Sequence, residues 1–170
     1  NGWIAEVHYP DPATGQPIAA PSFAFTYYAD GAVASRTDAK GNRFDYRYDE
    51  LGRLVEVGFL SKSAYATGDD TTGTVAFEYS PDGKPTLATV YDDQAQILYQ
   101  NQFDYDDRGN LVAEWQSHTG AVGGSTPFVG YEWEYSPADE THGNFDRLLS
   151  LTYPARPEAT GPRELTFHYG

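Results

Sequence analysis

The sequence predicts an all-β chain of repeated antiparallel β-hairpins, and two patterns lead to this fold class. Aromatic residues alternate with polar ones in short runs such as Phe44-Asp-Tyr46-Arg-Tyr48, which is the period-2 pattern of a strand with two different faces. Each run stops at turn residues such as Pro81-Asp82-Gly83, because aspartate caps the backbone locally and glycine accepts a positive φ. No stretch keeps a helical period for more than about two turns.

The hairpin pattern recurs along the whole chain. The first strands of the hairpins are expected at Phe25–Tyr27, Phe44–Tyr48, Phe77–Tyr79, Phe103–Tyr105, Tyr131–Tyr135 and Leu165–Tyr169. In the first four, a glycine follows the last tyrosine by four residues, and second strands are expected to begin two residues later, at Val33, Leu54 and Leu111. The fifth run enters a longer turn rich in Pro, Asp and Gly, whereas Ala64–Gly73 and Thr119–Ser125 are expected to be connections.

Composition agrees with strands and limits the function. The chain has 170 residues, among them 14 Tyr, 9 Phe and 3 Trp, and flat rings pack well on a pleated surface. A net charge of −14 argues against nucleic acid and against an anionic membrane surface, since both attract Lys and Arg. We interpret the acidity as a device for solubility; cation binding and an acidic partner are the alternatives.

The remaining bulk features are negative. The chain has no Cys, and therefore no disulfide or thiolate metal site, and it has no apolar run near the roughly 18 residues that span a bilayer. It begins at Asn1 without a signal-peptide pattern. We therefore interpret it as a processed product or a segment of a longer protein.

Two segments carry a family resemblance. Tyr48-Asp-Glu-Leu-Gly-Arg-Leu54 and Tyr105-Asp-Asp-Arg-Gly-Asn-Leu111 resemble the YD repeats of Rhs proteins, and weaker copies extend the resemblance over nearly the whole chain. The matching repeat positions are Tyr27, Gly31, Tyr48, Gly52, Leu54, Tyr79, Gly83, Tyr105, Gly109, Leu111, Tyr135 and Tyr169, with Gly2 and Ile4 at the start. The resemblance implies a coiled β-hairpin ribbon that is scaffold and not catalytic, as in bacterial Rhs and Tc toxins and in teneurins.

The sequence also departs from those toxin shells. They end in a plug, an autoproteolytic DPxG-like region and a toxin domain, none of which is evident here. Asp11-Pro-Ala-Thr-Gly15 has one residue too many for that cleavage motif, and we expect a turn there. The chain is also short for closing a toxin-sized cavity alone.

The two ends match each other as halves of one hairpin. Gly2-Trp-Ile4-Ala-Glu-Val7 aligns with Gly52-Arg-Leu54-Val-Glu-Val57, and Arg163–Gly170 resembles a first strand. We therefore interpret residues 1–170 as one YD/Rhs repeat region of about six hairpin units, one of them split across the termini. Either the ribbon is cut at a turn, or successive units complete each other by strand addition.

No residue pattern predicts an active site. The histidines His8, His118, His142 and His168 lack metal-ligand spacing and are expected at the surface. Asp104, Asp106 and Asp107, with Asn110, are the weak candidates for a cation such as Ca²⁺, as is Asp92-Asp93, but none has the spacing of a calcium loop. Arg53, Arg108 and Arg147 are expected to pair with nearby acids. We expect no enzyme, no cofactor and no catalytic residue.

These observations predict a structural role. We expect a scaffold segment of a secreted or surface bacterial assembly, polymeric or tandem, whose partners are copies of itself or adjacent repeats. The first alternative is a fragment of a shell that encapsulates a C-terminal toxin. The second is a carbohydrate-binding β module that uses exposed Trp3, Trp115 or Trp133.

Overall fold

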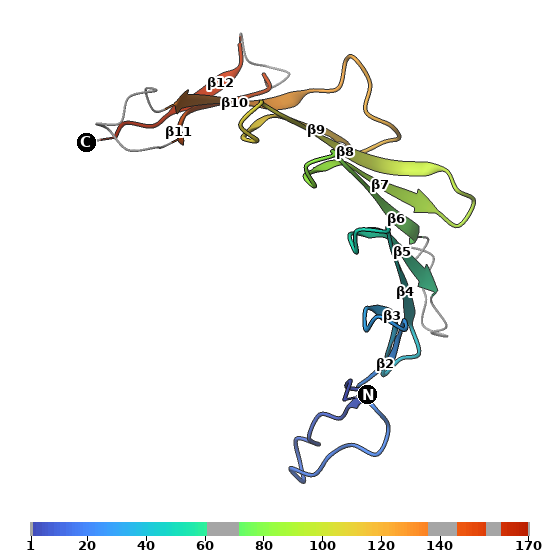
Figure 1. Ribbon diagram of the computed structural model, residues 1–170. Coiled ribbons are helices and arrows are strands. Elements are labelled where there is room, and N and C mark those ends of the chain that lie inside the picture. The colour runs from blue at the N-terminus through green and yellow to red at the C-terminus, as the bar shows by residue number, and fades with distance from the viewer. Residues whose placement is uncertain (1, 61–71, 136–145, 156–160, 170) are drawn as a thin grey trace. The chain divides into compact units, whose positions relative to one another are not determined.

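The fold is a single antiparallel sheet in which the strands follow one another in chain order (Figure 1). The computed structural model describes residues 2–60, 72–135, 146–155 and 161–169. Its twelve strands are β1 (Glu6–Val7), β2 (Phe23–Tyr27), β3 (Val33–Asp38), β4 (Arg43–Tyr48), β5 (Leu54–Leu60), β6 (Thr72–Tyr79), β7 (Pro85–Asp92), β8 (Ile97–Tyr105), β9 (Leu111–Ser117), β10 (Phe128–Tyr135), β11 (Asp146–Tyr153) and β12 (Arg163–Thr166).

The predicted all-β hairpin fold is confirmed. The described residues contain no helix, and therefore none that could cross a membrane. β3, β5 and β9 begin at the three residues expected from the glycine spacing, Val33, Leu54 and Leu111. Residues 119–125 connect β9 to β10 without a strand, as predicted. The Asp11–Gly15 segment is a turn, in which the Gly15 amide donates to the Asp11 carbonyl over 2.8 Å.

Two predicted boundaries are wrong. Gly73 was expected in a connection but lies in β6, where a Cβ atom on it would come within 2.5 Å of the Asp92 carbonyl oxygen. This glycine therefore permits a close approach of two backbones and does not mark a loop. The last predicted strand runs to Tyr169, whereas β12 ends at Thr166, although the Phe167 amide still donates to the Leu149 carbonyl over 2.8 Å.

A β-bulge recurs at the same place in the hairpins. Tyr27 pairs with Val33 while Thr26 pairs with Ser35, so Ala34 is the extra residue. Tyr48 with Leu54 and Tyr105 with Leu111 follow the same rule. A bulge increases the local twist of the ribbon. In these three hairpins it lies where the turn joins the two strands, and this repetition is a structural signature of the repeat.

The sheet has little fully buried interior. Among the described residues, Val90 and Ala113 are the buried hydrophobic ones, at 5% and 9% exposure. Aromatic pairs across neighbouring strands take the place of a thick core: the ring centroids of Phe44 and Phe59 lie 5.0 Å apart, and those of Trp115 and Phe128 lie 5.3 Å apart. Such cross-strand pairs each contribute about 0.2–1 kcal/mol.

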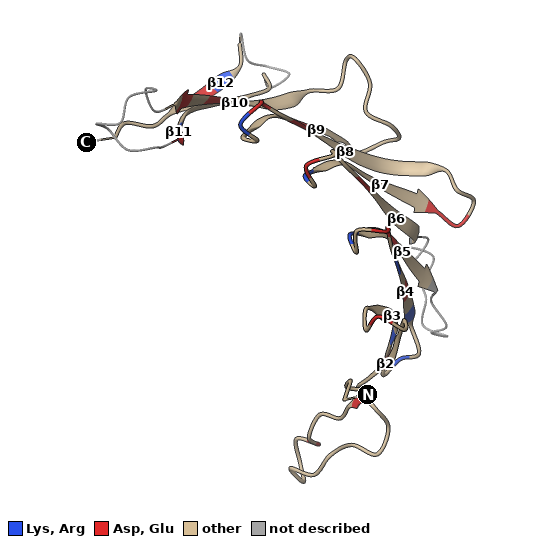
Figure 2. Cartoon of the chain, in the orientation of Figure 1, with Lys and Arg blue, Asp and Glu red and all other residues tan. Residues whose placement is uncertain are grey.

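Residue contacts divide the chain into two compact units. The first contains Asn1–Phe77 and Thr89–Ile97, and the second contains Glu78–Ala88 and Leu98–Gly170. Each of the contacts described below lies within one unit. Figure 2 shows that charged residues gather at turns, for example between β4 and β5 and between β8 and β9.

Candidate functional site: the tyrosine turns

The turns that follow the strand-ending tyrosines share one hydrogen-bonding scheme. In Asp49–Arg53 the Asp49 amide donates to the Arg53 carbonyl over 2.9 Å, and the Gly52 amide donates to the Asp49 carbonyl over 3.0 Å. The Asp49 carboxylate accepts from the amides of Leu51 and Arg53. The Arg53 amide is the main cause of the lowered pKa of Asp49. We call Tyr28–Ala32, Asp49–Arg53, Ser80–Lys84 and Asp106–Asn110 the tyrosine turns.

Glycine permits each reversal, as predicted. Gly31, Gly52, Gly83 and Gly109 all have positive φ, between 76° and 96°, a region that side chains with a Cβ atom rarely adopt.

Sequence reasoning missed two further turns of the same kind. Asp38–Asn42 and Asp92–Gln96 repeat the scheme, with the first amide donating to the fifth carbonyl over 2.9 and 3.0 Å. The signal for the first was present, since Asp38-Ala-Lys-Gly-Asn42 matches Asp106-Asp-Arg-Gly-Asn110 in its aspartate, glycine and asparagine. The second was hidden because Ala95, with a φ of 60°, occupies the glycine position.

A side-chain hydrogen bond links each of four hairpins to the one before it. The hydroxyls of Tyr27, Tyr105 and Tyr169 and the indole N–H of Trp133 donate to backbone carbonyls, those of Ile4, Pro85, Leu148 and Leu111 respectively, over 2.6–2.9 Å. Pro85 and Leu111 open the second strand of the preceding hairpin. Ile4 accepts in the same way, which agrees with its predicted equivalence to Leu54 and Leu111.

In the fifth hairpin the repeat position belongs to Trp133 and not to Tyr135, which the sequence analysis expected. Trp133 pairs with Leu148 at the bulge, as Tyr105 pairs with Leu111, and it makes the bond to the preceding hairpin. The cause is that the β10–β11 pairing continues past the bulge to Tyr135 and Asp146. The last aromatic residue of the run, Tyr135, therefore does not mark the bulge in this hairpin.

Two of the turn glycines, Gly31 and Gly109, lie against a side chain of the preceding hairpin. A Cβ atom on Gly31 would lie 2.9 Å from the Trp3 ring, which stacks on Tyr27 at 5.3 Å. A Cβ atom on Gly109 would lie 2.4 Å from the Lys84 side chain, whose ammonium lies 5.9 Å from the Tyr105 centroid. Gly31 is thus required for space as well as for conformation, whereas at Gly109 the close atoms belong to the flexible end of Lys84.

The weak cation candidates are held by their own turn. Asp106 accepts hydrogen bonds from the amides of Arg108 and Asn110 and from the Tyr135 hydroxyl. Asp104 and Asp107 are exposed. In the part of the chain that the structure describes, no three His, Cys, Asp or Glu side chains gather as a metal site would require, and the Asp92 carboxylate likewise accepts from the amides of Gln94 and Gln96.

The other predicted site residues serve local contacts. His8 is exposed and its ring donates to the Ile18 carbonyl, which is the main cause of its raised pKa. His118 and His168 are exposed, while His142 lies outside the described residues. Arg53 pairs with Asp49 at 2.6 Å, as expected of a neighbouring acid.

Two of the predicted arginine pairings take a different form. Arg108 pairs at 3.0 Å with Asp146, which is distant in sequence, and its guanidinium lies 4.5 Å from the Tyr135 centroid. Arg147 lies over the Tyr169 ring at 5.3 Å. Both of these contacts join consecutive hairpins.

The three tryptophans are less available than a sugar-binding platform needs. Trp133 is half-buried and its N–H is hydrogen-bonded, and Trp3, 41% exposed, packs on Tyr27. Trp115 lines a hollow of about 680 Å³ together with Phe128, Tyr153, Pro154 and Pro162. That hollow places a tryptophan on a concave surface.

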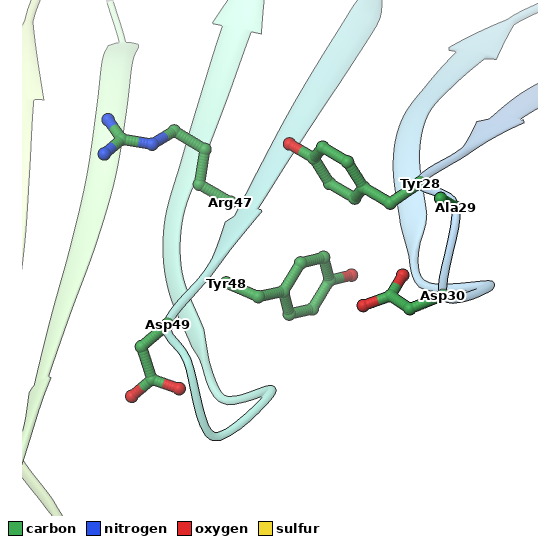
Figure 3. A pocket seen from close by; sticks show the side chains of 6 residues that line it. All are labelled: Tyr28, Ala29, Asp30, Arg47, Tyr48 and Asp49. Carbon is green, nitrogen blue, oxygen red and sulfur yellow. The ribbon is translucent and has the colours of Figure 1, made fainter.

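A second hollow lies between the first two tyrosine turns. It measures about 420 Å³ and is lined by Tyr28, Ala29, Asp30, Arg47, Tyr48 and Asp49 (Figure 3). The rings of Tyr28 and Tyr48 meet edge to face at 6.2 Å, and the Tyr28 hydroxyl donates to the Tyr46 carbonyl over 2.8 Å. Burial is the main cause of the raised pKa of Tyr48.

The family model for the RHS repeat matches residues 27–58. This stretch runs from the first tyrosine turn through β3, β4, the Asp49–Arg53 turn and most of β5. Residues 27–58 are thus similar to an RHS repeat. The resemblance to Rhs proteins that was inferred from Tyr48–Leu54 is therefore confirmed. The other turns repeat the geometry of the matched stretch.

Comparison with solved structures finds distant matches. The crystal structure of TcdB2-TccC3-Cdc42 is 16% identical, with a TM-score of 0.31 over 85% of this chain and 10% of that chain. A structure of the Photorhabdus luminescens Tc holotoxin pore is 18% identical, with a TM-score of 0.35 over 81% of this chain and 7% of that chain. The chain thus spans a tenth or less of their length. Comparison with curated proteins finds no match.

Proposed function

We propose that this chain is a non-enzymatic scaffold segment of RHS type, part of a secreted or surface bacterial assembly. The observation that carries the proposal is the repeated contact between hairpins: an aromatic side chain of one hairpin donates to a backbone carbonyl of the hairpin before it. The polar groups of the turns are used to hold the ribbon together. In this role the chain needs no cofactor and no catalytic residue.

We further propose that the edge hairpins are completed by another hairpin, from an adjacent repeat or a second copy. Tyr169 already makes the contacts of a first strand, with its ring under Arg147 and its hydroxyl on Leu148. The Ile4 carbonyl already accepts a hydrogen bond from the Tyr27 hydroxyl, as the carbonyl of a residue that opens a second strand does in other hairpins. β12, whose side chains are all exposed, and the two-residue β1 stand last and first in the sheet order, so each offers backbone groups for pairing.

The alternative, a fragment of a toxin-enclosing shell, shares this ribbon and differs in what the rest of the parent chain adds. The carbohydrate-binding alternative is favoured only by the hollow at Trp115 and Phe128. Glycan binding lost in Trp115→Ala and retained in Trp3→Ala would support it.

Electron microscopy and light scattering of the purified chain over a range of concentrations test the assembly. The Glu164 amide points away from β11, because the Phe167 amide, which faces the other way, donates to β11. Filaments with a regular axial repeat, lost when Glu164 is replaced by Pro in β12, are expected if copies complete each other. A monodisperse monomer at high concentration would contradict self-assembly and leave adjacent repeats as the partner. Closed shells would favour the toxin-enclosing alternative.

A further inference from the structure

Aromatic faces of this chain are repeatedly used to hold cations. A lysine or arginine lies over each of several rings at 4.5–5.9 Å from the centroid, namely those of Phe44, Tyr105, Tyr135, Tyr153 and Tyr169. This attraction arises because the face of an aromatic ring carries partial negative charge. The net charge of −14 adds a general attraction of cations to the chain.

The Tyr28–Tyr48 hollow has the same ingredients without the cation. Among the described residues, no lysine or arginine lies over either ring. The two rings converge on the hollow, and the Asp30 side chain points toward the Tyr48 hydroxyl (Figure 3). One Asp30 oxygen accepts from the Ala32 amide over 3.0 Å, and the carboxylate charge remains at the rim.

The two other charged side chains of the lining are directed elsewhere. Asp49 is engaged by its own turn and by Arg53. Arg47 extends away from the rings (Figure 3) and pairs with Glu56 at 3.0 Å. The hollow therefore combines two aromatic rings with one carboxylate that forms no ion pair with a Lys or Arg among the described residues, in a volume of about 420 Å³.

We propose that the hollow between Tyr28, Tyr48 and Asp30 binds an organic cation, an alkylammonium or guanidinium group. The rings supply the attraction to the cation and the apolar contact for its carbon atoms, and Asp30 supplies the neutralising charge. The group comes either from a free small molecule or from a lysine or arginine side chain of an adjoining repeat or partner, in which case it docks beside the turn as Lys84 does on Tyr105.

A matched pair of ligands tests charge separately from shape. Choline and 3,3-dimethyl-1-butanol have nearly the same shape, but only choline is charged. Titrations followed by NMR of the tyrosine ring signals are expected to give saturable shifts of Tyr28 and Tyr48 with choline, at concentrations on the order of millimolar, and about fivefold weaker binding of the alcohol. Equal binding of both, or shifts caused equally by sodium chloride, would overturn the proposal.

Two variants locate the site. Tyr48→Leu should abolish the saturable shift of Tyr28, and Asp30→Asn should weaken choline binding several-fold. Tyr135→Leu is the matched control, because that ring already lies under Arg108, and it should leave choline binding unchanged. Loss of binding in the control and not in Tyr48→Leu would contradict the assignment, and the comparison of the two ligands on the unaltered chain is unaffected by any variant that fails to fold.

A second titration distinguishes the sources of the cation. N-acetyl-lysine amide and N-acetyl-arginine amide represent side chains of a partner. Tighter binding of these amides than of choline indicates a side chain, and the reverse indicates a free quaternary ammonium compound. No shift with any of the three cations would overturn the proposal.

Discussion

The contact between successive hairpins is built twice with different chemistry. Near the start of the chain, Trp3 packs over Gly31 and stacks on Tyr27. In the second unit, Lys84 occupies the same position over Gly109 and beside Tyr105. The tyrosine hydroxyl donates to the carbonyl after this residue in both cases, to Ile4 and to Pro85.

The comparison teaches that the backbone geometry is fixed while the covering side chain varies. The glycine, the tyrosine and the carbonyl recur in both places. The residue after the preceding glycine needs only to lie flat across the next turn, and an aromatic ring or an aliphatic stem with a charge both do so. The energies of the two contacts should therefore differ, although their geometry agrees.

Replacing the turn glycines should give the largest effects. Gly31→Ala places a Cβ atom against a rigid indole ring at a φ of 96°, and we expect a loss of about 2–3 kcal/mol in the free energy of unfolding. Gly109→Ala should lose only about 1 kcal/mol, because the end of Lys84 can move aside. Urea unfolding of both variants measures the difference, and equal losses would contradict it.

Gly52→Ala serves as the control for those two variants. Its Cβ atom would meet nothing within 4 Å, while its φ is 76°. It therefore reports the conformational term alone, and we expect it to match Gly109→Ala.

Removing the covering side chain should separate the two contacts next. Trp3→Ala removes a ring that is 41% exposed and packs on Tyr27, and we expect a loss of about 2 kcal/mol. Lys84→Ala removes an aliphatic stem and an ion pair with the exposed Asp82, so we expect about 0.5 kcal/mol. Thermal unfolding that ranks the two in the opposite order would show that the ring does not carry the first contact.

The hydroxyl bonds should contribute equally in both places. Tyr27→Phe and Tyr105→Phe each remove one donor to a carbonyl, for an expected loss of about 1 kcal/mol. Tyr99→Phe is the control, since Tyr99 is 46% exposed and donates no hydrogen bond from its hydroxyl among the described residues. A loss in the control as large as in the other two would refute the assignment.

Acid should weaken the lysine contact through its aspartate. The Lys84 ammonium is the main cause that lowers the pKa of Asp82 from 3.8 to about 2. A carboxyl with a lowered pKa stabilises the fold above its unfolded-state pKa, and that contribution is lost as the pH falls from about 4 toward 2. Asp82→Asn should therefore flatten the pH dependence of unfolding in this range.

An Asp82→Asn variant that keeps the pH dependence of the unaltered chain in this range would contradict the role of the ion pair.

The sequence was enough for the strands and turns whose residues are local signals. The spacing from Tyr48 to Gly52 and Leu54 located a turn and a strand start, because the alternation of side chains and the glycine act within a few residues. The β-bulge at this place was not predicted. Sequence reasoning failed where a tertiary contact determines the local structure. Gly73 lies in a strand because it faces the Asp92 backbone. Trp133 takes the repeat position in place of Tyr135 because strand pairing continues past the bulge.

The contacts between hairpins could not be predicted at all. That Trp3 covers Gly31 and that Arg108 reaches Asp146 depends on which hairpins are neighbours, with 38 residues separating the second pair. The candidate cation ligand Asp106 accepts from two amides of its own turn, but its third donor, the Tyr135 hydroxyl, comes from the next hairpin and could not be predicted for the same reason.

Hydrogen exchange tests most directly whether another hairpin completes the edge hairpins. The experiment compares the single chain with a tandem fusion of two copies. If the join forms a hairpin, the β12 amides of the first copy, Arg163–Thr166, should exchange at least about tenfold more slowly in the fusion, while β8 and β9 remain unchanged. Equal exchange rates of β12 in both proteins would contradict the account.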